Sequence, residues 1–275
     1  LRPGFGGKIA AKNLRRCDQI KPTFCFPREQ EKMSRPSRRI SLLRSHITAA
    51  ETATAVDTTT TTHNMLIGGE LVKASSGAVD PVINPATGKA FDTVPAATSN
   101  DLDRAVMAAK QAFESWKRTP YAERAAAVKK FVQLLAERRE EMGKVLCMEQ
   151  GRPLPLAIKE VDRMGLKAAS VLEQGELLPE IKHETEDASY QIHYVPRGVV
   201  GGITPWNFPL SMAANKIFPP VITGNTVVLK PSPYTPLATV MLSEICAEAF
   251  PPGVVNILTG PDSLGQQIVE HPDIK

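Results

Sequence analysis

The sequence predicts an α/β protein in which amino-terminal helices precede the first half of a doubly wound parallel sheet. From Arg197 onward, short apolar runs rich in β-branched residues alternate with longer segments of helical period. This β-α-β-α-β order is typical of a parallel sheet with helical crossovers. The expected strands are Val199–Ile203, Thr226–Leu229 and Val254–Leu258.

Several elements are expected before the sheet. Met65–Val72 alternates polar and apolar residues around two glycines, which predicts a small hairpin, and Val79–Pro85 is predicted to be extended. Asn100-x-x-Asp103 marks the start of a helix. Its inward face is expected to carry Leu102, Ala105, Val106, Ala109, Ala112, Phe113 and Trp116.

Two longer helices and a strand complete this amino-terminal part. One helix is predicted from about Tyr121 to Met148, where Gly151 breaks it, and the next follows Pro153 and runs to about Leu172. Ser189–Val195 then alternates polar with apolar and aromatic residues, as a half-buried strand does.

The helices between the sheet strands have recognisable ends. A helix is expected over Pro209–Thr223, with Gly224-Asn225 closing it. The following helix is predicted to have Thr235 as its N-cap and Pro236 at its first position. A last helix should start near Pro261.

Residues 1–64 are predicted to be a disordered leader, and residues 65–275 the folded part. Residues 1–62 contain 12 Lys and Arg against 5 Asp and Glu, whereas the remainder contains 21 against 24. The Arg- and Ser-rich run from Met33 is typical of a mitochondrial transit peptide. The alternatives are a disordered tail, or translated sequence upstream of a start at Met33 or Met65. A cytoplasmic location is expected, and the Arg-rich leader makes a mitochondrial location the alternative.

Composition excludes several classes of protein. No stretch approaches the roughly 18 apolar residues of a membrane span, and the folded part has no excess of basic residues that would suit nucleic acid. The four cysteines form no CxxC pair and no metal-ligand spacing, so no metal site is expected. Cys147 and Cys246 lie in apolar helical patterns and are predicted to be buried, inert thiols.

The end of the strand Val199–Ile203 is the most informative position in the sequence. Pro205 and Pro209 fix the backbone on either side of Trp206-Asn207. Ligands bind at this carboxyl edge in open α/β sheets. A rigid amide there is a neutral hydrogen-bond donor, suited to an oxygen that becomes negative during a reaction. Lys230 ends the next strand and should place its ammonium at the same edge.

Five motifs, in this order and spacing along the chain, resemble the NAD(P)-dependent aldehyde dehydrogenase superfamily. They are V-I-N-P-A-T-G-K (Val82 to Lys89), E-Q-G-R-P-L (Glu149 to Leu154), V-V-G-G-I-T-P-W-N-F-P-L (Val199 to Leu210), G-N-T-V-V-L-K-P-S (Gly224 to Ser232) and P-P-G-V-V-N-I-L-T-G (Pro251 to Gly260). The resemblance implies a Rossmann-like, partial dinucleotide-binding domain over residues 65–275. It also implies an assembly strand at about residues 188–196, and hence a homo-oligomer in the full-length form.

The resemblance assigns roles to particular residues. Asn207 is expected to be catalytic, its side-chain amide donating to the oxyanion of a Cys thiohemiacetal. The residues expected to bind the coenzyme, NAD or NADP, are Ile203, Thr204, Trp206, Lys230, Ser232 and Gly265. Many NAD-preferring members carry a Glu three residues after the lysine, where this chain has Pro233. Loss of that carboxylate makes NADP acceptable without excluding NAD.

Two family motifs do not occur in the chain: E-L-G-G-K, with the catalytic Glu, and F-x-N-x-G-Q-x-C, with the nucleophilic Cys. We therefore expect a fragment, truncated before the catalytic domain, of an oxidoreductase that oxidises an aldehyde to a carboxylic acid. By itself it should be inactive, and an exposed sheet edge should favour association. No pattern selects one aldehyde.

Two other interpretations remain open at the level of sequence. One is a non-catalytic half-domain that binds a nucleotide or pairs with full-length subunits. The other is a relative of the acylating semialdehyde and acyl-phosphate reductases, which would need the Cys but not the Glu.

Overall fold

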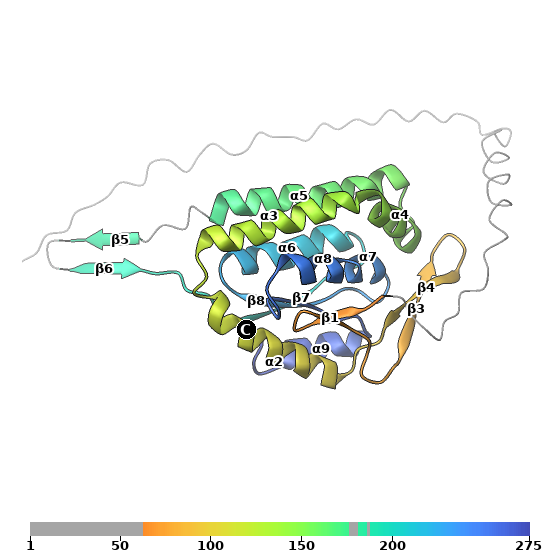
Figure 1. Ribbon diagram of the computed structural model, residues 1–275, viewed down its shortest axis with the longest axis horizontal. Helices are drawn as coiled ribbons and strands as arrows, with labels where there is room; N and C mark the ends of the chain where they lie inside the picture. Colours follow the sequence, from red (N-terminus) through yellow and green to blue (C-terminus); the bar gives the residue numbers. More distant parts are fainter. Residues whose placement is uncertain (1–62, 176–180, 186–187) are drawn as a thin grey trace, which may run out of the picture. The chain divides into compact units, whose positions relative to one another are not determined.

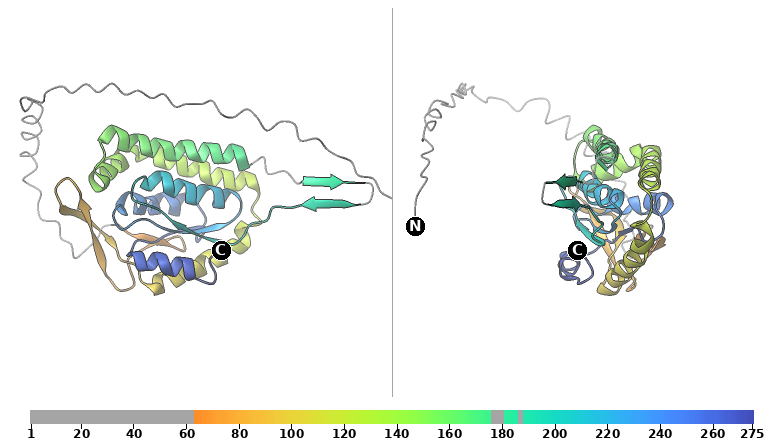
Figure 2. Two further views of the ribbon diagram at one scale, coloured as in Figure 1. Left: turned by 180° about the vertical axis from the view of Figure 1, so that it is seen from behind. Right: turned by 90° about the vertical axis from the view of Figure 1, so that its left-hand side faces the viewer.

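The computed structural model describes residues 63–175, 181–185 and 188–275 (Figures 1 and 2). The predictions for the leader up to residue 62, including its Arg-rich run, Cys17 and Cys25, lie outside the described residues. Among the described residues, no helix combines the length and the apolar character that crossing a bilayer requires.

The predicted α/β class is confirmed by three parallel strands. They are β7 (Val199–Ile203), β8 (Thr226–Lys230) and β9 (Val255–Ile257), and β8 lies between the other two. Every residue of β8 is buried, as its unbroken apolar run predicts for a central parallel strand. The register places Ile203 opposite Lys230, so both strands end at one edge of the sheet.

The predicted parallel strands belong to a mixed sheet, because the amino-terminal hairpin joins it. The strands β1 (Met65–Ile67) and β2 (Glu70–Val72) form the predicted hairpin, and β1 pairs antiparallel with β9. The sheet order is β2-β1-β9-β8-β7. The buried side chain of Asn256 accepts a hydrogen bond from Gly68 N at 2.8 Å, which fixes the hairpin turn against β9. This pairing joins distant segments, so no local pattern indicates it.

Helices cover both faces of the sheet. Helices α2 (Ser99–Trp116) and α9 (Asp262–Glu270) lie on one face, and α6 (Pro209–Ile222) and α8 (Leu242–Ala249) on the other, as Figure 1 shows. Helices α3 (Tyr121–Glu137) and α5 (Leu154–Gly175) form a further layer over α6 and α8. The main apolar core lies between these layers, where the Phe131 and Phe218 rings meet edge to face at 5.2 Å.

Two helix predictions need correction. The single helix expected from Tyr121 to Met148 is two helices, α3 and α4 (Arg139–Gln150), with Arg138 between them. Arg138 leaves helical geometry at φ −100° and ψ 10°, and its guanidinium pairs with Glu141 and Glu244. Helix α2 begins earlier than Asn100, since Thr98 is its N-cap and forms a capping box with Asp101.

Two smaller hairpins lie outside the main sheet. The strands β3 (Val79–Asn84) and β4 (Lys89–Pro95) pair antiparallel, and so do β5 (Ile181–Glu184) and β6 (Ser189–Ile192). The predicted strand near residue 190 is therefore present. However, all of β6 is exposed, so the expectation of a half-buried strand is wrong for this chain.

Candidate functional site

The corner after β7 is held by its main chain. Thr204 N donates to Lys230 O at 3.1 Å, which ties the end of β7 to β8. Pro209 begins α6 at its first position, where its missing N–H removes no helical hydrogen bond. The main-chain oxygen of Asn207 accepts hydrogen bonds from Gln150 Nε2 and from Arg152 Nη2, the latter at 2.8 Å.

None of these contacts involves the side chain of Asn207. Asn207 is exposed, and within the described part of the chain its carboxamide makes no hydrogen bond. Trp206 beside it is 58 % exposed. The corner thus has a fixed backbone and a free amide, which is the arrangement predicted for a hydrogen-bond donor to a ligand.

Lys230 is buried at the end of β8, with 1 % of its surface exposed. Its ammonium donates to Pro231 O at 3.1 Å, and the described residues offer no acceptor for its other two N–H groups. Burial lowers the pKa of Lys230, while the carboxylates of Asp262 and Asp80 oppose that shift. A buried ammonium with two N–H groups that no described residue uses is suited to binding hydroxyl or phosphate oxygens of a ligand.

Three predicted coenzyme residues come together at this edge. A methyl group added at Gly265, in the first turns of α9, would lie 3.8 Å from Ile203 Cδ1 and 3.9 Å from Lys230 Cδ. Gly265 therefore adjoins both strand ends. Ser232, although nearly buried, uses its hydroxyl within its own loop, where it accepts from Tyr234 N at 3.3 Å.

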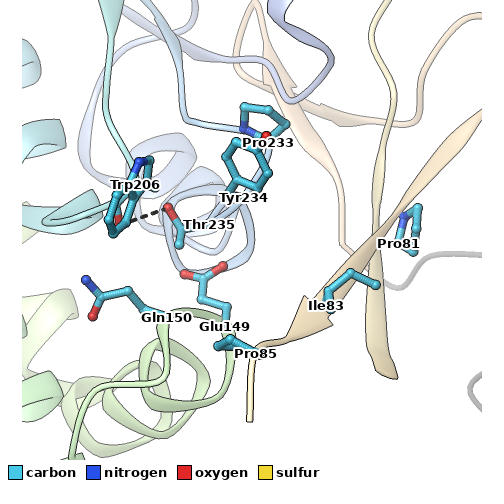
Figure 3. Close-up of a pocket in the computed structure, with 9 residues that line it drawn as sticks. All are labelled: Pro81, Ile83, Pro85, Glu149, Gln150, Trp206, Pro233, Tyr234 and Thr235. Carbon is cyan, nitrogen blue, oxygen red and sulfur yellow. Dashed lines mark hydrogen bonds between the residues drawn. The ribbon is translucent and has the colours of Figure 1, made fainter. Parts of the chain in front are cut away.

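A pocket of about 580 Å³ has Trp206 in its lining (Figure 3). It is lined by Pro81, Ile83, Pro85, Glu149, Gln150, Trp206, Pro233, Tyr234 and Thr235. Of the predicted site residues only Trp206 lines it. Lys230, Ile203 and Gly265 do not line this pocket, although Trp206 of the same corner does.

Glu149 occupies the position where Thr235 was expected to cap a helix. Helix α7 (Leu237–Val240) begins two residues after Thr235, and the Glu149 carboxylate accepts from Leu237 N at 2.7 Å and Ala238 N at 3.0 Å. The predicted cap is therefore wrong: Thr235 instead donates to Trp206 O at 3.5 Å (Figure 3). Burial raises the pKa of Glu149 to about 8 despite these two donors.

Sequence reasoning missed four residues around the corner. Glu149, Gln150 and Arg152 belong to the E-Q-G-R-P-L motif, which was noted only as a resemblance, and Glu160 lies in the first half of α5. The motif was the available signal, but its contacts join segments more than fifty residues apart.

The residues at the strand ends fit a dinucleotide. Thr204 Oγ1 is buried and has no hydrogen-bond partner in the described part of the chain, Lys230 has unused donors, and Gly265 leaves room beside them. Lys230 and Thr204 would hold polar groups of the coenzyme, and Ile203 and Gly265 would contact its apolar surfaces.

The described residues also bear on metal binding and on thiol chemistry. They contain no group of three or more His, Cys, Asp or Glu side chains that could hold a metal ion. Cys246 is buried, as predicted, and burial raises the pKa of its thiol far above the ordinary value. Cys147 is only half-buried, so the prediction of a buried thiol is wrong for that residue.

Residues 71–275 match the aldehyde dehydrogenase family. The chain belongs to that family. Its curated relatives include malonate-semialdehyde dehydrogenases of Halalkalibacterium halodurans, 43 % identical over 217 residues, and of Lacticaseibacillus casei, 42 % identical. Each alignment covers 76 % of this chain but only 44 % and 43 % of the relative. This aldehyde dehydrogenase chain therefore spans less than half the length of those relatives.

Solved structures of the family share its fold. A NAD-dependent aldehyde dehydrogenase from Sinorhizobium meliloti matches with a TM-score of 0.74 and 33 % identity, covering 79 % of this chain and 44 % of that one. A betaine aldehyde dehydrogenase from Staphylococcus aureus, solved in complex with NAD+, matches with a TM-score of 0.73 and 29 % identity, covering 78 % and 45 %. These likenesses confirm the predicted family and fold class.

Proposed function

We propose that the protein containing this chain oxidises an aldehyde to a carboxylic acid with NAD or NADP. The observation that carries the proposal is the family match across residues 71–275. When bound, the coenzyme would accept the hydride that the aldehyde carbon loses. The Cys and Glu of the family mechanism have no counterpart motif in this chain, so they would be supplied by sequence beyond it.

In this proposal Asn207 acts on the substrate, and the residues at the strand ends bind the coenzyme. The uncommitted Asn207 carboxamide donates to the oxygen that becomes negative when the aldehyde is attacked. Ile203, Thr204, Lys230 and Gly265 hold the coenzyme at the strand ends, with Ser232 and Trp206 beside them. This division is supported by the exposure of Asn207 and by the burial of Lys230 next to Gly265.

The substrate class is suggested by the relatives. Several of them are named malonate-semialdehyde dehydrogenases, so a short aldehyde that carries a carboxylate is the first substrate to assay. Pro233 brings no negative charge to the loop after Lys230, which is compatible with either coenzyme. Calorimetric titration of the chain with NAD+ and with NADP+ would measure the preference.

A comparison of two proteins tests the proposed reaction. The purified 275-residue chain and the longest product of its gene are assayed for reduction of NAD+ and NADP+ with malonate semialdehyde. We expect turnover by the longer product alone, and sequencing beyond the Lys275 codon should find both the Glu and the Cys motif. A Cys motif without the Glu would favour an acylating reductase, and turnover by the short chain would contradict the assignment of the nucleophile.

Subunit pairing is a second candidate function, and one observation supports it. The β5–β6 hairpin is exposed along β6, and Tyr190 and Ile192 are 50 % and 43 % exposed. We propose that this hairpin is the assembly strand through which chains associate. A pull-down with full-length subunits, but no coenzyme binding, would support a subunit-pairing half-domain instead of an enzyme.

A further inference from the structure

The E-Q-G-R segment, which spans the end of α4 and the loop before α5, contacts the main chain of the candidate oxyanion donor Asn207. Arg152 Nη2 donates to the main-chain oxygen of Asn207 at 2.8 Å, and its guanidinium lies 4.8 Å from the centroid of the Phe208 ring. Arg152 therefore contacts two consecutive residues of the corner. Neither contact uses the Asn207 carboxamide.

Arg152 is in turn held by a buried carboxylate. Its Nη1 atom forms an ion pair with Glu160 Oε2, and the Glu160 side chain is fully buried. Glu160 Oε1 accepts from Leu210 N and Ser211 N, both at 3.1 Å, in the first turn of α6. The same carboxylate thus fixes the guanidinium and the start of the helix that follows the corner.

We propose that Arg152 and Glu160 are positioning residues for Asn207. Together they fix the main chain from the Asn207 carbonyl to the first turn of α6, and so fix the position from which the Asn207 side chain extends toward the substrate oxygen. The inference rests on the proposed role of Asn207. Such placement matters because a donor stabilises a transition state best when it is already held near the position where charge develops.

Trp206 can report on the environment of the corner, so the inference can be tested without measuring activity. Trp206 lies next to Asn207, whereas Trp116 is buried and donates to Val221 O at 3.0 Å. In the 275-residue chain labelled with 5-fluorotryptophan, ¹⁹F NMR should give one resonance for each, assigned with W206F. Trp116 then serves as the internal control for the fold.

Two variants distinguish the loss of the positioning contacts from the loss of charge balance at Glu160. R152K keeps a positive charge near Glu160, but one ammonium cannot reproduce the planar fork that reaches both partners. We expect the Trp206 resonance to shift or broaden in R152K, while the Trp116 resonance stays unchanged. The double variant R152Q/E160Q removes the buried charge and keeps an acceptor for the α6 N–H groups, so it should fold and show the same change at Trp206.

A second Arg–carboxylate pair between α4 and α5 provides a control. Arg139 in α4 pairs with Asp162 in α5 at 2.5 and 2.9 Å and does not contact the corner. R139K should leave both resonances unchanged. If R152K and R152Q/E160Q also leave the Trp206 resonance unchanged, the inference is overturned.

Kinetics of the longer gene product distinguish this inference from the proposed function. R152K should lower kcat roughly ten- to a hundredfold, with the KM for coenzyme unchanged, as misplacement of a catalytic group does. A changed Trp206 resonance with a fully active N207A would remove the catalytic role of Asn207 and leave the positioning contacts intact.

Discussion

Asn207 and Lys230 show opposite ways of preparing a side chain for a ligand. Asn207 keeps its amide in solvent while its backbone oxygen accepts two hydrogen bonds. Lys230 instead holds its ammonium in a dry site with a single hydrogen bond. The Asn207 carboxamide is therefore accessible to a ligand. The Lys230 ammonium is buried, with N–H groups that no described residue uses. Each leads to its own expectation.

Replacing Asn207 should damage catalysis and not folding. In the longer gene product, N207A should lower kcat by about a hundredfold or more, the usual effect of removing one oxyanion donor. Because the carboxamide makes no contact in the described residues, the free energy of unfolding should change by less than about 0.5 kcal/mol. N100A, at an exposed position in α2, is the control, and equal losses of kcat in both variants would contradict the prediction.

Replacing Lys230 should weaken coenzyme binding without loss of stability. K230M keeps the length of the stem but removes the charge, which forms no ion pair among the described residues. We expect the Kd for NAD+ or NADP+ to rise about tenfold or more, by calorimetric titration. Thermal unfolding should be unchanged or shifted upward, since a desolvated charge is lost. K129M, on an exposed face of α3, should leave both quantities as they are.

At the scale of elements, the packing of α4 against α5 depends on a glycine in α4, whereas a glycine in α5 faces α3 at an ordinary contact distance. A Cβ at Gly143 in α4 would lie 2.6 Å from Ile158 Cγ1 and 3.3 Å from its Cα. A Cβ at Gly165 in α5 would meet only Val132 Cγ1, at 3.6 Å. The first glycine is required by the close approach of the helices, and the second is not.

Alanine at these two positions should therefore have opposite effects. G143A should destabilise the protein by about 1–3 kcal/mol through overpacking. G165A should stabilise it by roughly 0.5–1 kcal/mol, because alanine is the better helix former and finds ordinary contact there. Urea unfolding of the two variants measures the signs, and a loss of stability in both would refute the packing argument.

Local sequence patterns predicted the elements that are themselves local. The β-branched runs gave β7 and β8, and the prolines around Trp206-Asn207 gave the corner. What the sequence did not reveal depends on distant partners: the break at Arg138, which pairs with Glu244, and the cap that Glu149 supplies to α7. Ile203, Lys230 and Gly265 adjoin at the strand ends, as expected, but their roles stay predictions and the contacts that hold the corner were not expected.

Across the whole molecule, buried carboxylates should set how stability depends on pH. Burial raises the pKa of Glu149 from 4.5 to about 8 and raises that of Glu160 as well. The folded state then binds more protons than the unfolded state between these values, so the free energy of unfolding should fall as pH rises from about 4.5 to about 8. The lowered pKa values of Asp101, Asp162, Glu114 and Glu141 act in the opposite direction, but mainly at the acidic end of this range and below it, where the unfolded state still binds their protons.

E149Q isolates this contribution. The amide oxygen can still accept from the start of α7, and it does not ionise. Denaturant unfolding at pH 5, 6, 7 and 8 should show the variant gaining stability relative to the wild type with each step. Parallel curves for the two proteins would show that Glu149 does not titrate in this range.

The antiparallel partnership of β1 with β9 has a consequence for biosynthesis. Leu66 pairs with Ile257, so one of the first segments of the described chain to leave the ribosome must wait for one of the last. Until then the apolar run Met65–Ile67 pairs with β2 on one side but lacks β9 on the other, and closure of so long a loop is slow. The nascent chain is therefore expected to depend on chaperones that shield this run during synthesis.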